Sequence, residues 1–179
     1  MRLALYEPDI PGNAGTCIRL CACLGIGIDI IEPCGFILSD ARMKRAGMDY
    51  ALRATIRRHA DWAGFVAARS AEAPEGRLVL ATTRGAVPHT DFAFRPDDVL
   101  LMGSETAGVP DAVHDAVDAR VRIAMVPGMR SLNVAVAASM ILGEALRQTG
   151  GFPAALTSSE PGSSQSPALQ PVLPEETSR

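Results

Sequence analysis

Short apolar segments alternate with segments of helical periodicity along the first 150 residues of the chain. Short apolar runs bounded by Gly, Pro or Asp are typical of buried strands, whereas apolar residues three or four positions apart indicate helices. Strands and helices in alternation predict an α/β fold, in which a mostly parallel sheet carries helices on both faces. The predicted strands cover residues 2–6, 27–31, 54–58, 78–82, 99–102 and 121–125. The predicted helices cover residues 14–24, 61–70, a stretch that begins near Pro110, and 132–148.

Local signals predict where two of these helices begin or end. Asp61 is a predicted N-cap, because its side chain can accept a hydrogen bond from an amide of the first turn. Gly150-Gly151 is a stop signal for the last helix, whose apolar positions include Val136, Met140 and Leu146.

Length and composition indicate one domain followed by a tail. The chain has 179 residues, 47% of them hydrophobic, which is enough for one sizeable core and short for two. Residues 151–179 contain five prolines and six serines without apolar periodicity, so we expect a disordered, dispensable tail behind a domain of residues 1–150. The composition excludes a collagen-like chain, a disulfide miniprotein and a wholly disordered protein.

We expect a cytoplasmic protein without a metal site. No apolar run approaches the roughly 20 residues that span a bilayer, and Glu7-Pro8 interrupts the opening segment too early for a signal peptide. The three histidines are scattered along the sequence, which does not fit the spacing of metal ligands. The four cysteines are predicted to be reduced and to pack as small buried hydrophobes. They are Cys17, Cys21, Cys23 and Cys34.

Four loops are candidates for ligand binding, since open α/β sheets bind ligands at the carboxyl ends of their strands. Three of them follow predicted strands, and the fourth precedes the first helix. They cover residues 82–85, 103–108, 127–133 and 11–15. Their glycines would let the backbone approach a flat or tightly wrapped ligand, although glycines that only make turns give the same pattern.

Three common motifs do not fit these loops. Residues 103–108 have the glycine spacing of a phosphate loop, but Val109-Pro110 stands where Lys and Ser or Thr must hold phosphate and magnesium. Gly25-Ile26-Gly27 follows a helix and not a strand, which does not suit a dinucleotide-binding fingerprint. Neither Ser104 nor Ser131 lies in the G-x-S-x-G frame of a hydrolase nucleophile.

Three further motifs occur in order along the chain. They are Asn13-Ala14-Gly15 with Arg19, then residues 103–110, then Ile123-Ala124-Met125 with residues 130–133. Between the first two motifs lie Phe36, Asp40, Arg42, Arg45-Ala46-Gly47 and Asp49-Tyr50. Together these residues resemble the SPOUT methyltransferases, and most closely the small, single-domain tRNA (cytidine/uridine-34-2'-O)-methyltransferases. The resemblance covers residues 1–150.

The resemblance implies a C-terminal trefoil knot, a homodimer, and S-adenosylmethionine bound in a bent form without a metal. The implied cofactor contacts are Ala81, Gly103, Glu105, Ile123, Met125 and Ser131. The three apolar side chains suit a slot for adenine, the glycine allows close approach, and the serine offers a hydroxyl at the start of the last helix.

Arg19 is the residue that the resemblance associates with activation of the ribose hydroxyl. A guanidinium stays protonated at any working pH, so we expect Arg19 to orient the target phosphate and to stabilise the developing alkoxide. Without the resemblance, Arg19 would be interpreted as a solvated charge on the first helix.

Glu105 has two interpretations. Either it caps the following turn or pairs with an arginine, or it polarises the site near the sulfonium. Asn133 is predicted to start the last helix.

The sequence departs from the family pattern at Ser104 and Ala107, which replace a proline and an arginine of the second motif. Ala124 replaces a proline of the third motif. We expect these changes to loosen the loops and to remove a possible RNA contact without preventing cofactor binding.

The charge distribution permits an RNA partner although the net charge is -3. Residues 40–59 hold six basic and two acidic side chains, a local charge of +4. The resemblance places RNA contacts in this segment, at Arg42, Arg45 and Tyr50. A solvated face would show the same charge pattern.

The resemblance therefore implies S-adenosylmethionine-dependent 2'-O-methylation of the wobble nucleotide of tRNA, a cytidine or uridine at position 34, with leucine tRNA as the expected substrate. Two alternatives stay open. One is methylation of another position in tRNA or rRNA, and the other is a non-catalytic RNA-binding module on the same fold.

Overall fold

The fold is described from a computed structural model, which describes residues 1–37, 54–84 and 86–154. Its centre is a seven-stranded sheet in the order β3-β2-β1-β6-β4-β7-β5, and each pair of neighbouring strands is parallel. The predicted α/β fold with a mostly parallel sheet is confirmed. The strands are β1 (Arg2–Tyr6), β2 (Gly27–Ile31), β3 (Ile56–His59), β4 (Leu78–Ala81), β5 (Val87–Pro88), β6 (Val99–Met102) and β7 (Ala119–Arg122).

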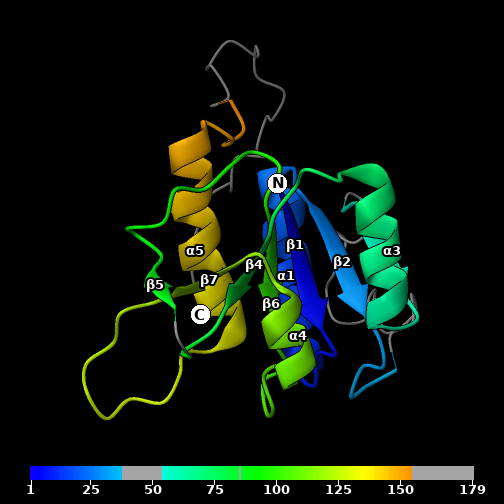
Figure 1. The fold of residues 1–179 in the computed structure, drawn as a ribbon, viewed down its shortest axis with the longest axis horizontal. Coiled ribbons are helices and arrows are strands. Elements are labelled where there is room, and N and C mark those ends of the chain that lie inside the picture. Colours follow the sequence, from blue (N-terminus) through cyan, green and yellow to red (C-terminus); the bar gives the residue numbers. More distant parts are fainter. Residues whose placement is uncertain (38–53, 85, 155–179) are drawn as a thin grey trace, which may run out of the picture.

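Helices cover both faces of the sheet, as predicted. Those in the described part of the chain are α1 (Pro11–Leu24), α3 (Trp62–Glu72), α4 (Asp111–Ala116) and α5 (Val134–Thr149). Figure 1 shows α3 and α4 in front of the sheet and α1 behind it. Because side chains alternate along a strand, Leu3 and Leu5 of β1 pack with α1 and α5, whereas Ala4 and Tyr6 pack with α3 and α4. The sheet is therefore buried between two apolar layers.

Several boundaries differ from the predicted ones. The strand expected at 121–125 is β7, which begins earlier, at Ala119, and ends at Arg122, opposite Pro88, where its neighbour β5 also ends. Strand β5 was not predicted, since two residues are too short to show any periodicity. Strand β3 runs two residues later than expected at its start and ends at His59.

The helix ends follow local chemistry. Helix α1 begins at Pro11, before the predicted start, because proline is suited to the first helical position. Asp61 caps α3 as predicted, and its side chain accepts a hydrogen bond from the Gly64 amide at 2.7 Å. Helix α5 begins at Val134 instead of 132 and ends at Thr149, and the next residue, Gly150, adopts the left-handed conformation typical of a stop signal.

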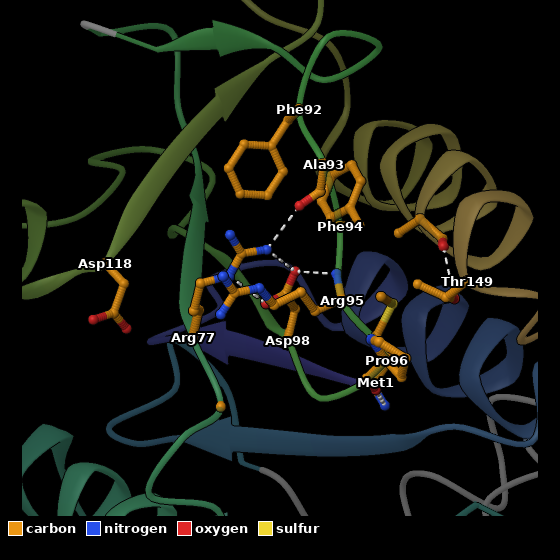
Figure 2. Close-up of polar contacts among 12 residues, drawn as sticks. Met1, Arg77, Phe92, Ala93, Phe94, Arg95, Pro96, Asp98, Asp118 and Thr149 are labelled. Atoms are coloured by element: carbon orange, nitrogen blue, oxygen red, sulfur yellow. Dashed lines mark hydrogen bonds and ion pairs between the residues drawn. The ribbon is translucent and has the colours of Figure 1, made fainter.

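Within residues 1–37, 54–84 and 86–154, two carboxylates are buried in the sheet region, and both have cationic partners. Asp29 in β2 bonds the Arg2 Nε at 2.7 Å and the His59 Nε2 at 2.8 Å. Asp98 immediately precedes β6, and its two oxygens bond Arg77, immediately before β4, at 2.9 and 2.8 Å. Figure 2 shows the Arg77 guanidinium between Asp98 and the ring of Phe92. The pair joins the amino ends of two adjacent strands.

The cysteines have three different environments. Cys17 and Cys21 are fully buried in the layer between α1 and the sheet, which confirms the prediction for these two. Burial raises the pKa of both thiols to about 12, so they behave as small hydrophobes. The prediction is wrong for Cys23, which is exposed because it lies on the outer face of α1. Cys34 is half-buried and follows β2, outside the helix.

In the three described stretches, no helix combines the length and the apolar character required to cross a bilayer.

Candidate functional site

A cavity of about 550 Å³ lies at the carboxyl ends of three adjacent strands, β6, β4 and β7. The first turn of α1 and the first half of α5 form its other walls. All four segments predicted as ligand-binding candidates contribute lining residues, at Asn13, Thr82, Gly103 and Ser131 among others, although residues 11–15 form the first turn of α1 and not a loop. The volume suits a small organic ligand.

The six residues that the resemblance assigned to the cofactor all line this cavity, although they span 51 positions of sequence from the first to the last. Each stands where a strand ends or where a helix is about to begin. They are Ala81 at the end of β4, Gly103 directly after β6, Glu105 in the following turn, Ile123 and Met125 after β7, and Ser131 before α5. The parallel sheet brings them together because the carboxyl ends of its strands share one edge.

The turn after β6 is closed by its own backbone. The Ser104 amide donates to the Gly108 carbonyl and the Gly108 amide donates to the Ser104 carbonyl, both at 2.9 Å. A Cβ on Gly103 would lie 2.7 Å from the carbonyl carbon of Gly108. Position 103 therefore requires glycine, because the backbone of the turn leaves no room for a side chain. The sequence indicated close approach of a ligand, whereas the close neighbour in the structure is the chain's own backbone.

A chain of side-chain hydrogen bonds links the three motifs. Glu105 Oε1 accepts from Asn13 Nδ2 at 3.0 Å, and Asn13 Oδ1 accepts from Asn133 Nδ2 at 2.9 Å. Asn133 Oδ1 then accepts from the Ala135 amide at 2.9 Å and the Val136 amide at 3.3 Å, which confirms that Asn133 caps the last helix. The chain fixes the turn after β6 relative to both α1 and α5.

Glu105 contacts two residues that lie close together in the sequence. Its partners are Asn13 and the Asp9 amide, which donates to Oε2 at 2.8 Å. Among the described residues, the contacts of the carboxylate thus lie in the segment before α1, and the interpretation as a cap or as an arginine partner stays a prediction. The interpretation as a polarising group stays a prediction.

Arg19 does not line the cavity. It lies on the exposed face of α1, the helix whose first turn contributes Asn13 to the wall. Residues 12, 16, 19 and 23 are exposed along this face, at the spacing of one helix side. The structure thus separates Arg19 from the residues of the predicted cofactor site.

The structure describes only residues 54–59 of the basic segment 40–59. Arg42, Arg45 and Tyr50, the predicted RNA contacts, lie outside the described residues. Arg57 and Arg58 are described and pair with Glu72 and Glu32, the latter at 2.8 Å, so part of the local charge of +4 is neutralised.

Some cavity residues were not singled out from the sequence. Ile10, Thr82, Thr83 and Thr106 lie in or next to loops that were identified, but hydroxyl and apolar residues in loops carry no specific signal. Ala137 and Ile141 belong to α5 and have the helical spacing of core residues. Among the described residues, no three His, Cys, Asp or Glu side chains form a group that could hold a metal ion.

Comparison with known proteins gives strong similarities. A protein from Ancylobacter novellus named tRNA (cytidine(34)-2'-O)-methyltransferase is 62% identical over 152 residues, which cover 85% of this chain and 95% of the relative. A solved structure described as giving insights into the 2-OH methylation of C/U34 on tRNA is 38% identical with a TM-score of 0.75, and covers 82% of this chain and 94% of that one.

A more distant structure is the SpoU methyltransferase AviRb from Streptomyces viridochromogenes in complex with the cofactor AdoMet. It is 31% identical with a TM-score of 0.73, and the match covers 83% of this chain and 60% of AviRb. The sequence also matches the SpoU rRNA Methylase family over residues 1–143. This chain belongs to that family.

Proposed function

We propose that this chain is an S-adenosylmethionine-dependent tRNA methyltransferase that methylates the ribose 2'-hydroxyl of nucleotide 34, a cytidine or uridine. The observation that carries this proposal is the cavity at the ends of β6, β4 and β7, which all six candidate cofactor residues line. The name of the Ancylobacter relative supports the choice of tRNA and of position 34.

The lining residues suit the parts of this cofactor. Ala81, Ile123 and Met125 provide apolar walls for adenine, whose polar edge can bond backbone groups of the loops. Ser131 offers a hydroxyl near the start of α5, and Glu105 offers a carboxylate that favours a cationic neighbour. When bound, S-adenosylmethionine supplies a methyl group on a sulfonium.

Methyl transfer requires the ribose oxygen to approach in line, with the C–O bond forming as the C–S bond breaks and the hydroxyl proton leaving. We assign Arg19 to orienting the target phosphate and to stabilising the developing negative charge on the oxygen. Its exposed position on α1, outside the cofactor cavity, leaves it accessible to an RNA. Arg42, Arg45 and Tyr50 are proposed RNA contacts, and leucine tRNA is the proposed substrate.

A thermal shift tests cofactor binding directly. S-adenosylmethionine at about one hundred times its Kd should stabilise the native state by roughly 2.7 kcal/mol, which raises Tm by about 5 °C or more. Adenosine triphosphate at the same concentration is the control ligand. The absence of a shift with S-adenosylmethionine would favour the non-catalytic module.

Nucleoside analysis tests the target. A strain without this protein should lose a 2'-O-methylated pyrimidine from tRNA, and an unchanged profile would contradict the assignment. The family description favours a second candidate, methylation of rRNA. Purified tRNA and rRNA offered separately with labelled cofactor distinguish the two, because only the true substrate accepts label.

The proposal includes a homodimer that uses the exposed sides of α1 and α5. Val136 and Met140 of α5 are 49% and 43% exposed, and Ile10 before α1 is 45% exposed. Helices α1 and α5 pack against each other, and exposed apolar side chains on or beside such a helix pair are typical of an interface between subunits.

Met140→Glu should therefore give a monomer in light scattering at micromolar concentrations, because a charge would be buried without a partner. Val87→Glu is the matched control, since Val87 is equally exposed, at 47%, but lies in the edge strand β5. A Met140→Glu protein that stays dimeric would contradict this interface.

We further propose a C-terminal trefoil knot, a catalytic domain of residues 1–150 with 151–179 as a dispensable tail, and a cytoplasmic location. Membership of the family supports the knot, and the family match over residues 1–143 supports the domain boundary.

A further inference from the structure

Asp9, in the loop between β1 and α1, contacts the turn after β6. Its Oδ2 accepts hydrogen bonds from the Thr106 amide, at 3.2 Å, and from the Thr106 hydroxyl. Its own amide donates to Glu105 Oε2 at 2.8 Å. These bonds join residues that are 96 or 97 positions apart in the sequence. Asp9 therefore holds the turn by both its side chain and its backbone.

The acceptor in these hydrogen bonds is charged. The hydrogen bonds from the Thr106 hydroxyl and amide hold the pKa of the Asp9 carboxyl below its usual value. Asp9 is thus a carboxylate at any working pH, and hydrogen bonds to a charged acceptor are stronger than those to a neutral one.

The turn needs an external support of this kind. Within residues 103–108, the Ser104–Gly108 bridge and a bond of 3.2 Å from the Ala107 amide to the Ser104 hydroxyl close the turn on itself. Such internal bonds fix the shape of the turn but not its orientation in the molecule. Asp9 and Asn13 supply contacts that join it to the segment before α1.

Asp9 is itself held in place from the other side. Glu7 has φ of 42°, an uncommon value for a residue other than glycine, and its amide donates to the Ile31 carbonyl at 2.9 Å. The Gly35 amide donates to the Pro8 carbonyl at 3.0 Å, and a Cβ on Gly35 would lie 3.0 Å from the Asp9 Cα. The loop that carries Asp9 is thus packed against the ends of β1 and β2.

We propose that Asp9 is a positioning residue for the cofactor, which orients the 103–108 turn, and Glu105 with it, without lining the cavity itself. Thr106 and Glu105 do line the cavity, so a shift of the turn would change its wall directly. This inference rests on the proposed function, because it takes the ligand of the cavity to be S-adenosylmethionine.

The test compares variants of the two partners by calorimetric titration of the full chain with S-adenosylmethionine. Asp9→Ala should raise the Kd about tenfold, and Asp9→Asn less, because the amide keeps an acceptor oxygen without the charge. Thr106→Val should raise the Kd, and Thr106→Ser should restore it because serine keeps the hydroxyl. The KM for tRNA should stay unchanged in all four variants.

Double substitution separates this specific role from general damage. Asp9→Ala combined with Thr106→Val should bind no worse than Asp9→Ala alone, since the same contact is removed twice. Asp91→Ala is the control, because Asp91 accepts a similar bond from the Thr90 hydroxyl, at 3.1 Å, in a loop outside the cavity. Its Kd should equal that of the unaltered protein.

Two results would overturn the proposal: an Asp9→Ala protein that binds as tightly as the unaltered chain, or effects of Asp9→Ala and Thr106→Val that simply add. If Asp9→Ala does not fold, the comparison of Thr106→Val with Thr106→Ser still tests the proposal. Equal Kd values for these two variants would show that the bond between Thr106 and Asp9 does not affect cofactor binding. If the unaltered chain does not bind S-adenosylmethionine, the proposed function fails as well. If the unaltered chain binds S-adenosylmethionine and the variants bind it equally well, only the role of Asp9 is refuted, and the proposed function stands.

Discussion

Arg19→Ala should reduce the rate of methyl transfer about a hundredfold or more while the Kd for S-adenosylmethionine stays nearly the same. The separation follows from the geometry: Arg19 is exposed on α1, and the candidate cofactor residues line a cavity that it does not touch. Loss of a cation that stabilises the developing alkoxide raises the barrier of the chemical step. Single-turnover transfer to tRNA and calorimetric titration of the cofactor measure the two quantities separately.

Two control variants sharpen this result. Arg19→Lys keeps the charge but loses the planar fork of donors, so a partial loss of rate would indicate that Arg19 bonds a phosphate with two donors. Arg95→Ala removes an exposed arginine near the amino end of β6, opposite to the cavity, and should leave the rate unchanged. Full activity of Arg19→Ala would refute the catalytic assignment, and a Kd raised in parallel with the loss of rate would move Arg19 into the cofactor site.

Asp98→Ala should destabilise the fold strongly, with a loss of about 3 kcal/mol in the free energy of unfolding. Asp98 is 1% exposed, and it bonds Arg77 twice and the Arg95 amide at 2.8 Å. Removal leaves a partly buried guanidinium without its anion, next to the Phe92 ring (Figure 2). Urea unfolding measures the change directly, and Tm should fall by roughly 6 °C or more.

The neighbouring Asp97 provides a matched control, because its side chain is exposed at the same end of the sheet. Asp97→Ala should change the free energy of unfolding by less than about 0.5 kcal/mol. The double variant Asp98→Ala with Arg77→Met should recover part of the loss, since no unpaired charge is then buried. If Asp98→Ala and Asp97→Ala are equally stable, the pair at the amino ends of β4 and β6 contributes nothing to stability.

The sequence was sufficient to predict the architecture because its strands are buried on both faces. The limits of β1, β2 and β6 agree with the prediction to the residue, since each is a short apolar run followed by Glu-Pro or Gly. The prediction extended the strand that is β7 to residue 125, because Ile123 and Met125 are apolar. In the structure these two residues line the cavity and do not belong to the strand. Apolar character alone does not distinguish a core residue from a ligand-binding one.

The candidate site was predictable as a set of loops but not as a network. Asn13, Glu105 and Asn133 each stand in a motif, yet nothing in the sequence shows that their side chains bond one another in series. The contact between Asp9 and Thr106 has no signal at all, because each residue is an ordinary loop residue until the fold brings them together. Similarly, α5 shows helical periodicity, but only the structure separates Leu146, which is buried, from Val136 and Met140, which are exposed.

The cavity takes its walls from residues as early as Ile10 and as late as Ile141. A nascent chain therefore has no complete site until nearly all of the folded region has left the ribosome and α5 has docked against α1. Because a ligand stabilises only the state that binds it, cellular S-adenosylmethionine would protect finished molecules and leave stalled or truncated ones to proteases. On the proposed function, the methyl donor would thus also act as a selective stabiliser of intact copies.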